Sequence, residues 1–173
     1  REAFSALLKN HPQSRLRSAA EACLRLIAAG EALREASRKG QLLMESLLAA
    51  CHHKGLDRLV ITDHNTIAGA NAARRIEPEM VIVGEEIKTT KGELLAVFVK
   101  EEIPAGLSPV ETIQRLRSQG AFISVSHPFD ELRGGSWRLP DLLEIAPLVD
   151  AIEVFNAHCL FSDPNRRAQA FAR

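Results

Sequence analysis

A short apolar run that ends in polar residues decides the fold of this chain: Leu59-Val60-Ile61-Thr62-Asp63-His64. The apolar part is too short for a helix and rich in β-branched residues, so it predicts a strand with Asp63 and His64 at its carboxyl end. An imidazole there can bind a metal, and the adjacent carboxylate can orient the imidazole or act as a bridging ligand. A histidine after a strand is more often structural, so this run alone does not establish a metal site.

The next apolar run, Met80–Gly84, predicts a second strand that leads into Glu85 and Glu86. Neighbouring side chains of an extended chain point to opposite faces. The two acids therefore cannot both face the same site. Taken alone, acids in this position are commonly solvated.

A third strand is predicted over residues 121–126, and it ends at His127, directly before Pro128. A proline restricts the residue before it to extended geometry, which would hold His127 at the strand tip. Polar side chains surround a fourth predicted strand, over residues 151–155, in the same pattern: Glu153, Asn156 and His158.

Helical patterns separate these strands, over residues 68–75, 108–119 and 141–146, and a last helix opens at Asp163-Pro164. Lys91-Gly92 marks a turn into residues 93–99, so a hairpin is expected there. The alternation predicts an α/β fold with a mainly parallel sheet, whose sites form at the carboxyl ends of strands. Histidine and glutamate at several such ends suit zinc, manganese or iron.

Composition narrows the class of protein. Twenty-two basic residues balance twenty-two acidic ones among 173, so no overall field favours nucleic acid or an anionic membrane. The apolar runs are shorter than the roughly 20 residues that span a bilayer. Three separated cysteines, Cys23, Cys51 and Cys159, form neither a disulfide framework nor a zinc pair, and we expect them reduced in the cytoplasm.

Four segments together resemble the PHP superfamily, named for polymerases and histidinol phosphatase. Residues 55–66 resemble the second motif of that family. Three later segments resemble further signatures in the same order and spacing: Gly84-Glu85-Glu86-Ile87, Ser126-His127-Pro128 and Ile152-Glu153-Val154-Phe155-Asn156. The resemblance covers about residues 44–173.

The resemblance implies a distorted (β/α)7 TIM-like barrel that holds two or three zinc, manganese or iron ions and hydrolyses phosphoesters. The metal ligands of the family map to His64, Glu86 and His127, and Glu93 stands where many members have a histidine. His127 and Asp63 are the expected catalytic residues. The expected substrate is a phosphorylated small molecule or the end of a short nucleic acid, with no membrane partner. The residues expected to bind it are Arg133, Asn156 and His158.

Two family motifs have no counterpart in this sequence. Residues 1–43 read as a helical segment of unclear role and lack the opening Asp-x-His-x-His, and the closing Gly-Ser-Asp-x-His is also absent. We therefore expect an incomplete portion of a metal-dependent phosphoesterase, with residues 44–173 forming an incomplete barrel domain. The alternatives are a degenerate, non-catalytic PHP module with a structural or partner-binding role, or another metal hydrolase on a related barrel.

Overall fold

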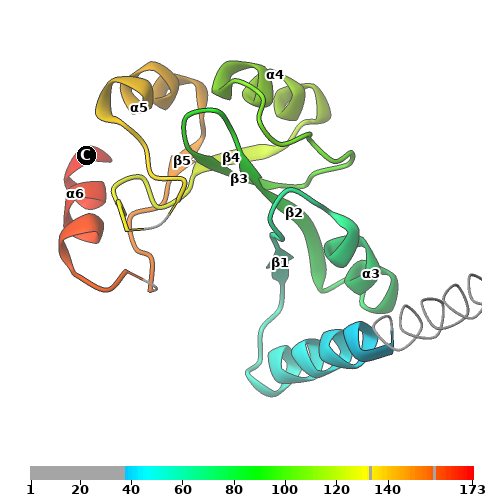
Figure 1. The fold of residues 1–173 in the computed structure, drawn as a ribbon. Helices are drawn as coiled ribbons and strands as arrows, with labels where there is room; N and C mark the ends of the chain where they lie inside the picture. The colour runs from blue at the N-terminus through cyan, green and yellow to red at the C-terminus, as the bar shows by residue number, and fades with distance from the viewer. Residues whose placement is uncertain (1–37, 133, 158) are drawn as a thin grey trace, which may run out of the picture. The chain divides into compact units, whose positions relative to one another are not determined.

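A computed structural model of the 173-residue chain describes residues 38–132, 134–157 and 159–173 (Figure 1). The chain divides into two compact units, residues 1–50 and 51–173. The described part of the first unit, residues 38–50, is helical. In the second unit, Gly55 adopts a φ of +69° and its N–H donates to the carbonyl of His52, as is common directly after the end of a helix. The domain boundary predicted after residue 43 stays a prediction.

Five strands form one sheet in the second unit, in the order of the sequence: β1 (Leu59–Ile61), β2 (Val81–Lys88), β3 (Glu93–Val97), β4 (Phe122–Val125) and β5 (Ala151–Ile152). β1 is parallel to β2 and β4 is parallel to β5, whereas β3 is antiparallel to both of its neighbours. Among the described residues the sheet is open, with β1 and β5 at its edges. The predicted α/β class is confirmed.

The expectation of a mainly parallel sheet is wrong, because the hairpin that the sequence predicts reverses β3. The turn Thr89–Gly92 is too short for a crossover, so β2 and β3 can pair only antiparallel. The N–H and hydroxyl of Thr89 both donate to the carbonyl of Gly92, at 2.9 and 2.7 Å. β2 also continues beyond the predicted strand to Lys88, which places Glu85 and Glu86 inside the sheet.

Helices connect the strands at the predicted places: α3 (Ala68–Ile76), α4 (Pro109–Gln119), α5 (Leu139–Ile145) with a short 3-10 turn at Ala146–Leu148, and α6 (Asp163–Phe171). The ends of α4 follow the sequence signals. Ser108 Oγ accepts the N–H of Glu111 at 3.2 Å, and Gly120 ends the helix with a φ of +76°. α3 packs on β1 and β2, and α4 packs on β4.

The two faces of the sheet differ in burial. On the face that we call the covered face, Ile87, Leu94 and Val125 pair across β2, β3 and β4 and are fully buried. On the opposite face, which we call the site face, Glu86, Leu95 and Ser124 pair across the same strands and are only partly buried. Because side chains alternate along a strand, Glu85 belongs to the covered face and Glu86 to the site face.

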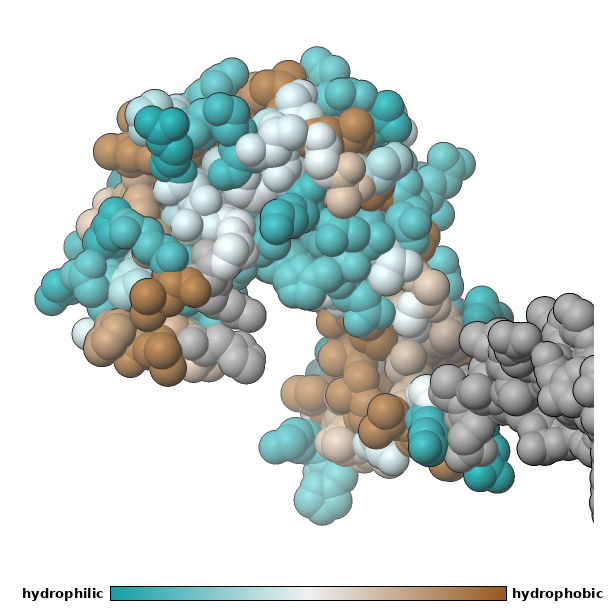
Figure 2. Space-filling view, in the orientation of Figure 1, coloured by the Kyte–Doolittle hydropathy of each residue, from teal (hydrophilic) through white to brown (hydrophobic). Residues whose placement is uncertain are grey.

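The surface carries a hydrophobic area beside α6. Figure 2 shows hydrophobic side chains gathered over α6 and the segment before it. In that segment, Leu160 is 81% exposed and Phe161 is 67% exposed. None of the helices in the described part of the chain is long and apolar enough to cross a lipid bilayer.

Candidate metal centre

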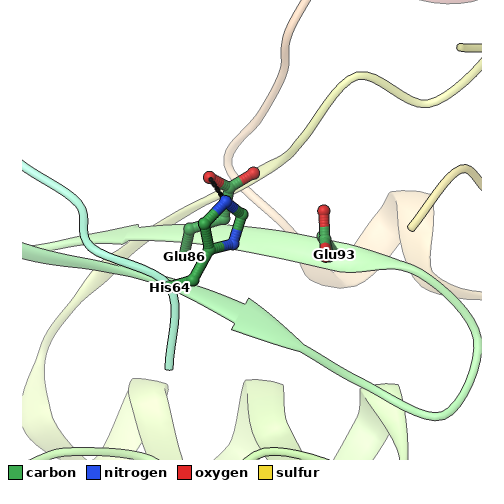
Figure 3. Close-up of side chains that lie close together, drawn as sticks. All are labelled: His64, Glu86 and Glu93. Atoms are coloured by element: carbon green, nitrogen blue, oxygen red, sulfur yellow. Dashed lines mark ion pairs between the residues drawn. The ribbon is translucent and has the colours of Figure 1, made fainter. Parts of the chain in front are cut away.

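Four of the predicted site residues lie together on the site face: His64, Glu86, Glu93 and His127. His64, Glu86 and Glu93 each offer a ligand atom within 4.8 Å of the others (Figure 3). His127 Nε2 lies 3.4 Å from Glu86 Oε1 and 3.1 Å from Glu93 Oε2. We call these four residues the His–Glu cluster. It brings together side chains from separate segments of the chain, as the sequence predicted.

An extension of the β1–β2 pairing places His64. Beyond β1, His64 forms a parallel bridge with Glu86. The N–H of Glu86 donates to the carbonyl of Asp63 at 3.1 Å, and the N–H of Asn65 donates to the carbonyl of Glu86 at 2.9 Å. Asn65 then turns the chain with a φ of +56°, which asparagine tolerates better than most residues. His64 Nε2 consequently lies 3.6 Å from Glu86 Oε2.

Antiparallel pairing of β2 with β3 brings Glu93 close to Glu86 on the site face. Glu93 begins β3 opposite Lys88, so it shares a face with Glu86 two residues earlier in β2. Hydrogen bonds hold both the backbone N–H and the backbone carbonyl of Glu93. The N–H of Glu93 donates to the carbonyl of Gly135 at 3.0 Å, and its own carbonyl accepts Trp137 Nε1 at 3.1 Å. A side chain at Gly135 would collide with the carboxyl group of Glu93, so this close approach requires glycine.

His127 adopts a geometry that differs from the prediction. Its φ is +22°, whereas the following proline led us to expect extended backbone. Hydrogen bonds account for this: its N–H donates to Glu153 Oε2 at 2.6 Å, and its carbonyl accepts the N–H of Asp130 at 3.2 Å. The turn directs the imidazole into the cluster, where the side chain is 3% exposed.

The cluster opens to solvent on one side. The His64 side chain is 58% exposed, Glu86 is 15% exposed and Glu93 is 7% exposed. Access for water or a ligand is therefore from the His64 side, and His127 and Glu93 form the closed side.

The surroundings of Glu86 favour its ionised form. Burial opposes its ionisation, but hydrogen bonds from His127 and Ser126 and the charge of His64 outweigh burial and hold the pKa of Glu86 below its usual value. The Ser126 hydroxyl donates to Glu86 Oε1 at 2.8 Å. Its neighbour Glu85 behaves in the opposite way, since burial raises the pKa of Glu85 to about 7 despite a hydrogen bond from the N–H of Ile103.

The donor set of the cluster could hold a divalent ion. It offers two imidazoles and two carboxylates, the donors that zinc, manganese and iron accept in proteins. Ligand atoms about 2.1 Å from one ion lie about 3–4 Å from each other. The separations of 3.1, 3.4 and 3.6 Å fall in this range, although His127 and His64 lie next to different oxygens of Glu86. The ligand atoms of His64, Glu86 and Glu93 lie within the wider limit of 4.8 Å, so these side chains would have to move closer together to surround one ion.

The other predicted site residues lie elsewhere. The carboxylate of Asp63 lies beside the backbone of Gly69 in α3 and is not brought into the cluster. The Asn156 amide donates to Glu153 Oε2 at 3.4 Å, and its backbone exchanges hydrogen bonds with the Asn165 side chain. Arg133 and His158 lie outside the described residues.

Ser126 and Glu153 belong to the site, although the sequence did not predict a role for either residue. Ser126 donates to the Glu86 carboxylate, and Glu153 holds the backbone of His127. Both belong to the segments that carry the resemblance: Ser126 lies directly before His127, and Glu153 lies directly after β5. Their place in these segments was the one sequence feature that could have pointed to a role for Ser126 and Glu153. Their hydrogen-bond partners can be identified only from the folded structure.

Comparison with known proteins gives relatives without a described activity. No protein-family model matches the chain. An uncharacterized protein of Methanocaldococcus jannaschii is 38% identical over 117 residues, which is 65% of this chain and 66% of that protein. A second uncharacterized protein of the same organism is 40% identical over 115 residues, or 65% of this chain and 45% of that protein. The chain thus spans less than the full length of either relative, and it is similar to both.

Proposed function

We propose that this chain supplies central ligands of a metal-dependent phosphoesterase of the PHP type, of which it forms a portion. The convergence of His64, Glu86, Glu93 and His127 on the site face of the sheet carries this proposal. The order and spacing of the motifs that hold these residues support the family. On this proposal, the open five-stranded sheet is part of a distorted (β/α)7 barrel.

The residues of the cluster suit the binding of an ion and the positioning of a phosphate ester. When bound, a divalent ion would supply Lewis acidity and an activated water for attack on phosphorus. Glu86 is the central ligand, because Ser126 and His127 keep it ionised. Glu93 and His127 form the buried side, so the phosphate ester would approach past the exposed His64.

The substrate would be a nucleotide, a short oligonucleotide or a small phosphorylated metabolite. The charge of the whole chain is balanced, so an anionic substrate would depend on local charge at the site. Arg133 and His158 stay proposals for this role. Asn156 is 9% exposed and bonds to Glu153, which favours a role in holding Glu153 over direct substrate contact.

A degenerate, non-catalytic PHP module is the second candidate. One observation favours it: the described residues form a single group of potential metal ligands, whereas the family holds two or three ions. A single ion would bind without the second one that stabilises the leaving oxygen in two-metal hydrolysis.

Metal titration and an activity assay together test the proposal. We expect the 173-residue chain to bind manganese or zinc weakly, because a partial ligand set leaves coordination positions to water. The full-length protein should bind more tightly and hydrolyse an aryl phosphate or a nucleotide bisphosphate with metal added. Tight, stoichiometric metal on the chain alone would contradict the incomplete ligand set. Tight metal binding by an inactive full-length protein would favour the non-catalytic module.

A further inference from the structure

A cavity lies at the opposite end of β2 from the His–Glu cluster. It has a volume of about 410 Å³, within the range of small-ligand sites. Val81, Val83 and Val99 line it, and each is at most 3% exposed, so they form an apolar floor. Val81 begins β2, and at about 3.3 Å per residue Glu86 is roughly 16 Å further along the strand. The cavity is therefore separate from the candidate metal centre.

Three cations surround this cavity. Arg58 comes from the loop before β1, Arg74 from the last turn of α3, and Lys100 from the segment after β3. In the part of the chain that the structure describes, none of the three forms an ion pair. Glu79 is the one carboxylate in the lining, so three positive charges face one negative charge. The local field favours an anion.

Phe98 supplies an exposed ring at the same cavity. It follows β3 directly, is 56% exposed and adopts a φ of +66°, an unusual conformation for a bulky residue. Hydrogen bonds from the next two residues, Val99 and Lys100, fix the backbone conformation of Phe98. The N–H of Val99 donates to the carbonyl of Val83 at 3.1 Å, and the N–H of Lys100 donates to Gln119 Oε1 at 2.8 Å. The strained backbone thus keeps an aromatic side chain at the surface, where burial gives it little stability.

We propose that this cavity binds an anion that carries a planar ring. The anionic group, a phosphate, would be held by Arg58, Arg74 and Lys100, and the ring would stack on Phe98 above the valine floor. Binding here does not depend on the His–Glu cluster or on any metal.

Calorimetric titration with adenosine 5′-monophosphate in EDTA tests this site while metal-dependent binding is suppressed. We expect saturable binding of one molecule per chain, and weaker binding of inorganic phosphate, which lacks the ring. Arg74→Ala should weaken binding of adenosine 5′-monophosphate about tenfold, because it removes a charge-assisted contact. Arg75→Ala is the matched control, since Arg75 is also in the last turn of α3 but does not line the cavity.

A second variant tests the contribution of the Phe98 ring to binding separately from that of the cationic side chains. Phe98→Gly should preserve the fold, because glycine adopts a positive φ without strain. It should weaken adenosine 5′-monophosphate and leave inorganic phosphate unchanged. No saturable binding of the nucleotide, or equal effects of Arg74→Ala and Arg75→Ala, would overturn the proposed site. Equal affinity for the nucleotide and inorganic phosphate would overturn the assignment to a ring-bearing ligand.

Discussion

Glu85 and Glu86 are neighbours in β2, yet they occupy opposite chemical environments. Glu85 points into the covered face, is 0% exposed and has a pKa raised to about 7 by burial. Glu86 points to the site face, where two hydrogen bonds and a nearby imidazole lower its pKa. One step along a strand therefore separates a carboxyl group that tends to be neutral from one that is ionised.

This difference indicates which face carries the candidate metal centre. The covered face surrounds Glu85 with apolar side chains and offers it the N–H of Ile103. The site face gathers other ionisable side chains around Glu86, and that cluster opens to solvent at His64. A buried acid on the covered face affects stability, whereas an acid on the site face can bind a ligand. Substitutions on the two faces should accordingly change different measured quantities.

The largest effect is expected on the site face, from His127→Ala. In the full-length protein, the rate of hydrolysis of an aryl phosphate with added manganese should fall at least about 100-fold, because a ligand is lost and loss of a ligand's supporting partner alone costs about 10–100-fold. His53→Ala is the matched control, since His53 is an exposed histidine at the end of the helix of residues 38–53. Normal turnover in His127→Ala, with an unchanged circular dichroism spectrum, would remove His127 from the site.

The covered face should respond to Glu85→Gln through stability. The folded-state pKa of Glu85, about 7, lies above the ordinary value of 4.5, so the folded chain binds the proton more tightly than the unfolded chain. Stability should then fall as pH rises from about 4.5 through 7, and the loss approaches about 3 kcal/mol above pH 7. Glutamine stays neutral and should abolish that loss.

Urea unfolding at pH 5 and pH 8 measures this effect of Glu85. Glu85→Gln should be more stable than the natural chain at pH 8 and nearly equal to it at pH 5. An equal difference in stability at both pH values would contradict the neutral, buried state of Glu85.

A smaller effect should follow from Ser126→Ala. Loss of the hydroxyl removes one hydrogen bond that lowers the pKa of Glu86, so the pKa should rise and Glu86 should protonate at higher pH. Metal affinity is lost as pH falls through this pKa, and the loss should therefore begin at a higher pH in the variant. At neutral pH we expect affinity to fall about tenfold.

Manganese titration from about pH 3.5 to pH 7 checks this shift, because the pKa of Glu86 lies below the ordinary value of 4.5. Ser124→Ala provides the control, because Ser124 lies two residues before Ser126, in β4 and on the site face, but donates to the carbonyl of Val125. Identical pH profiles for the two variants would show that the Ser126 hydroxyl does not act on Glu86.

Local sequence signals predicted much of this arrangement. The apolar runs located the strands, the helical pattern over residues 108–119 located α4, and alternation separated Glu85 from Glu86. These features depend on residues close together in the chain, so a pattern can indicate them. The grouping of His64 with Glu86 was likewise expected, because parallel strands end at the same edge.

Features that depend on distant contacts could not be predicted from the sequence. The φ of His127 follows from a bond to Glu153, which is 26 residues away. The contact of Ser126 with Glu86 spans 40 residues and depends on the register of three strands. A pattern identifies such residues as polar but gives no information about their partners.

One titration measures directly whether the site face of β2 binds a divalent ion. Manganese is added to the natural chain, to Glu86→Gln and to Glu85→Gln at pH 7.5, and free manganese is followed by electron paramagnetic resonance. We expect saturable binding to the natural chain and to Glu85→Gln, and loss of that binding in Glu86→Gln. Equal binding by the two variants, or no saturable binding to the natural chain, would contradict this expectation.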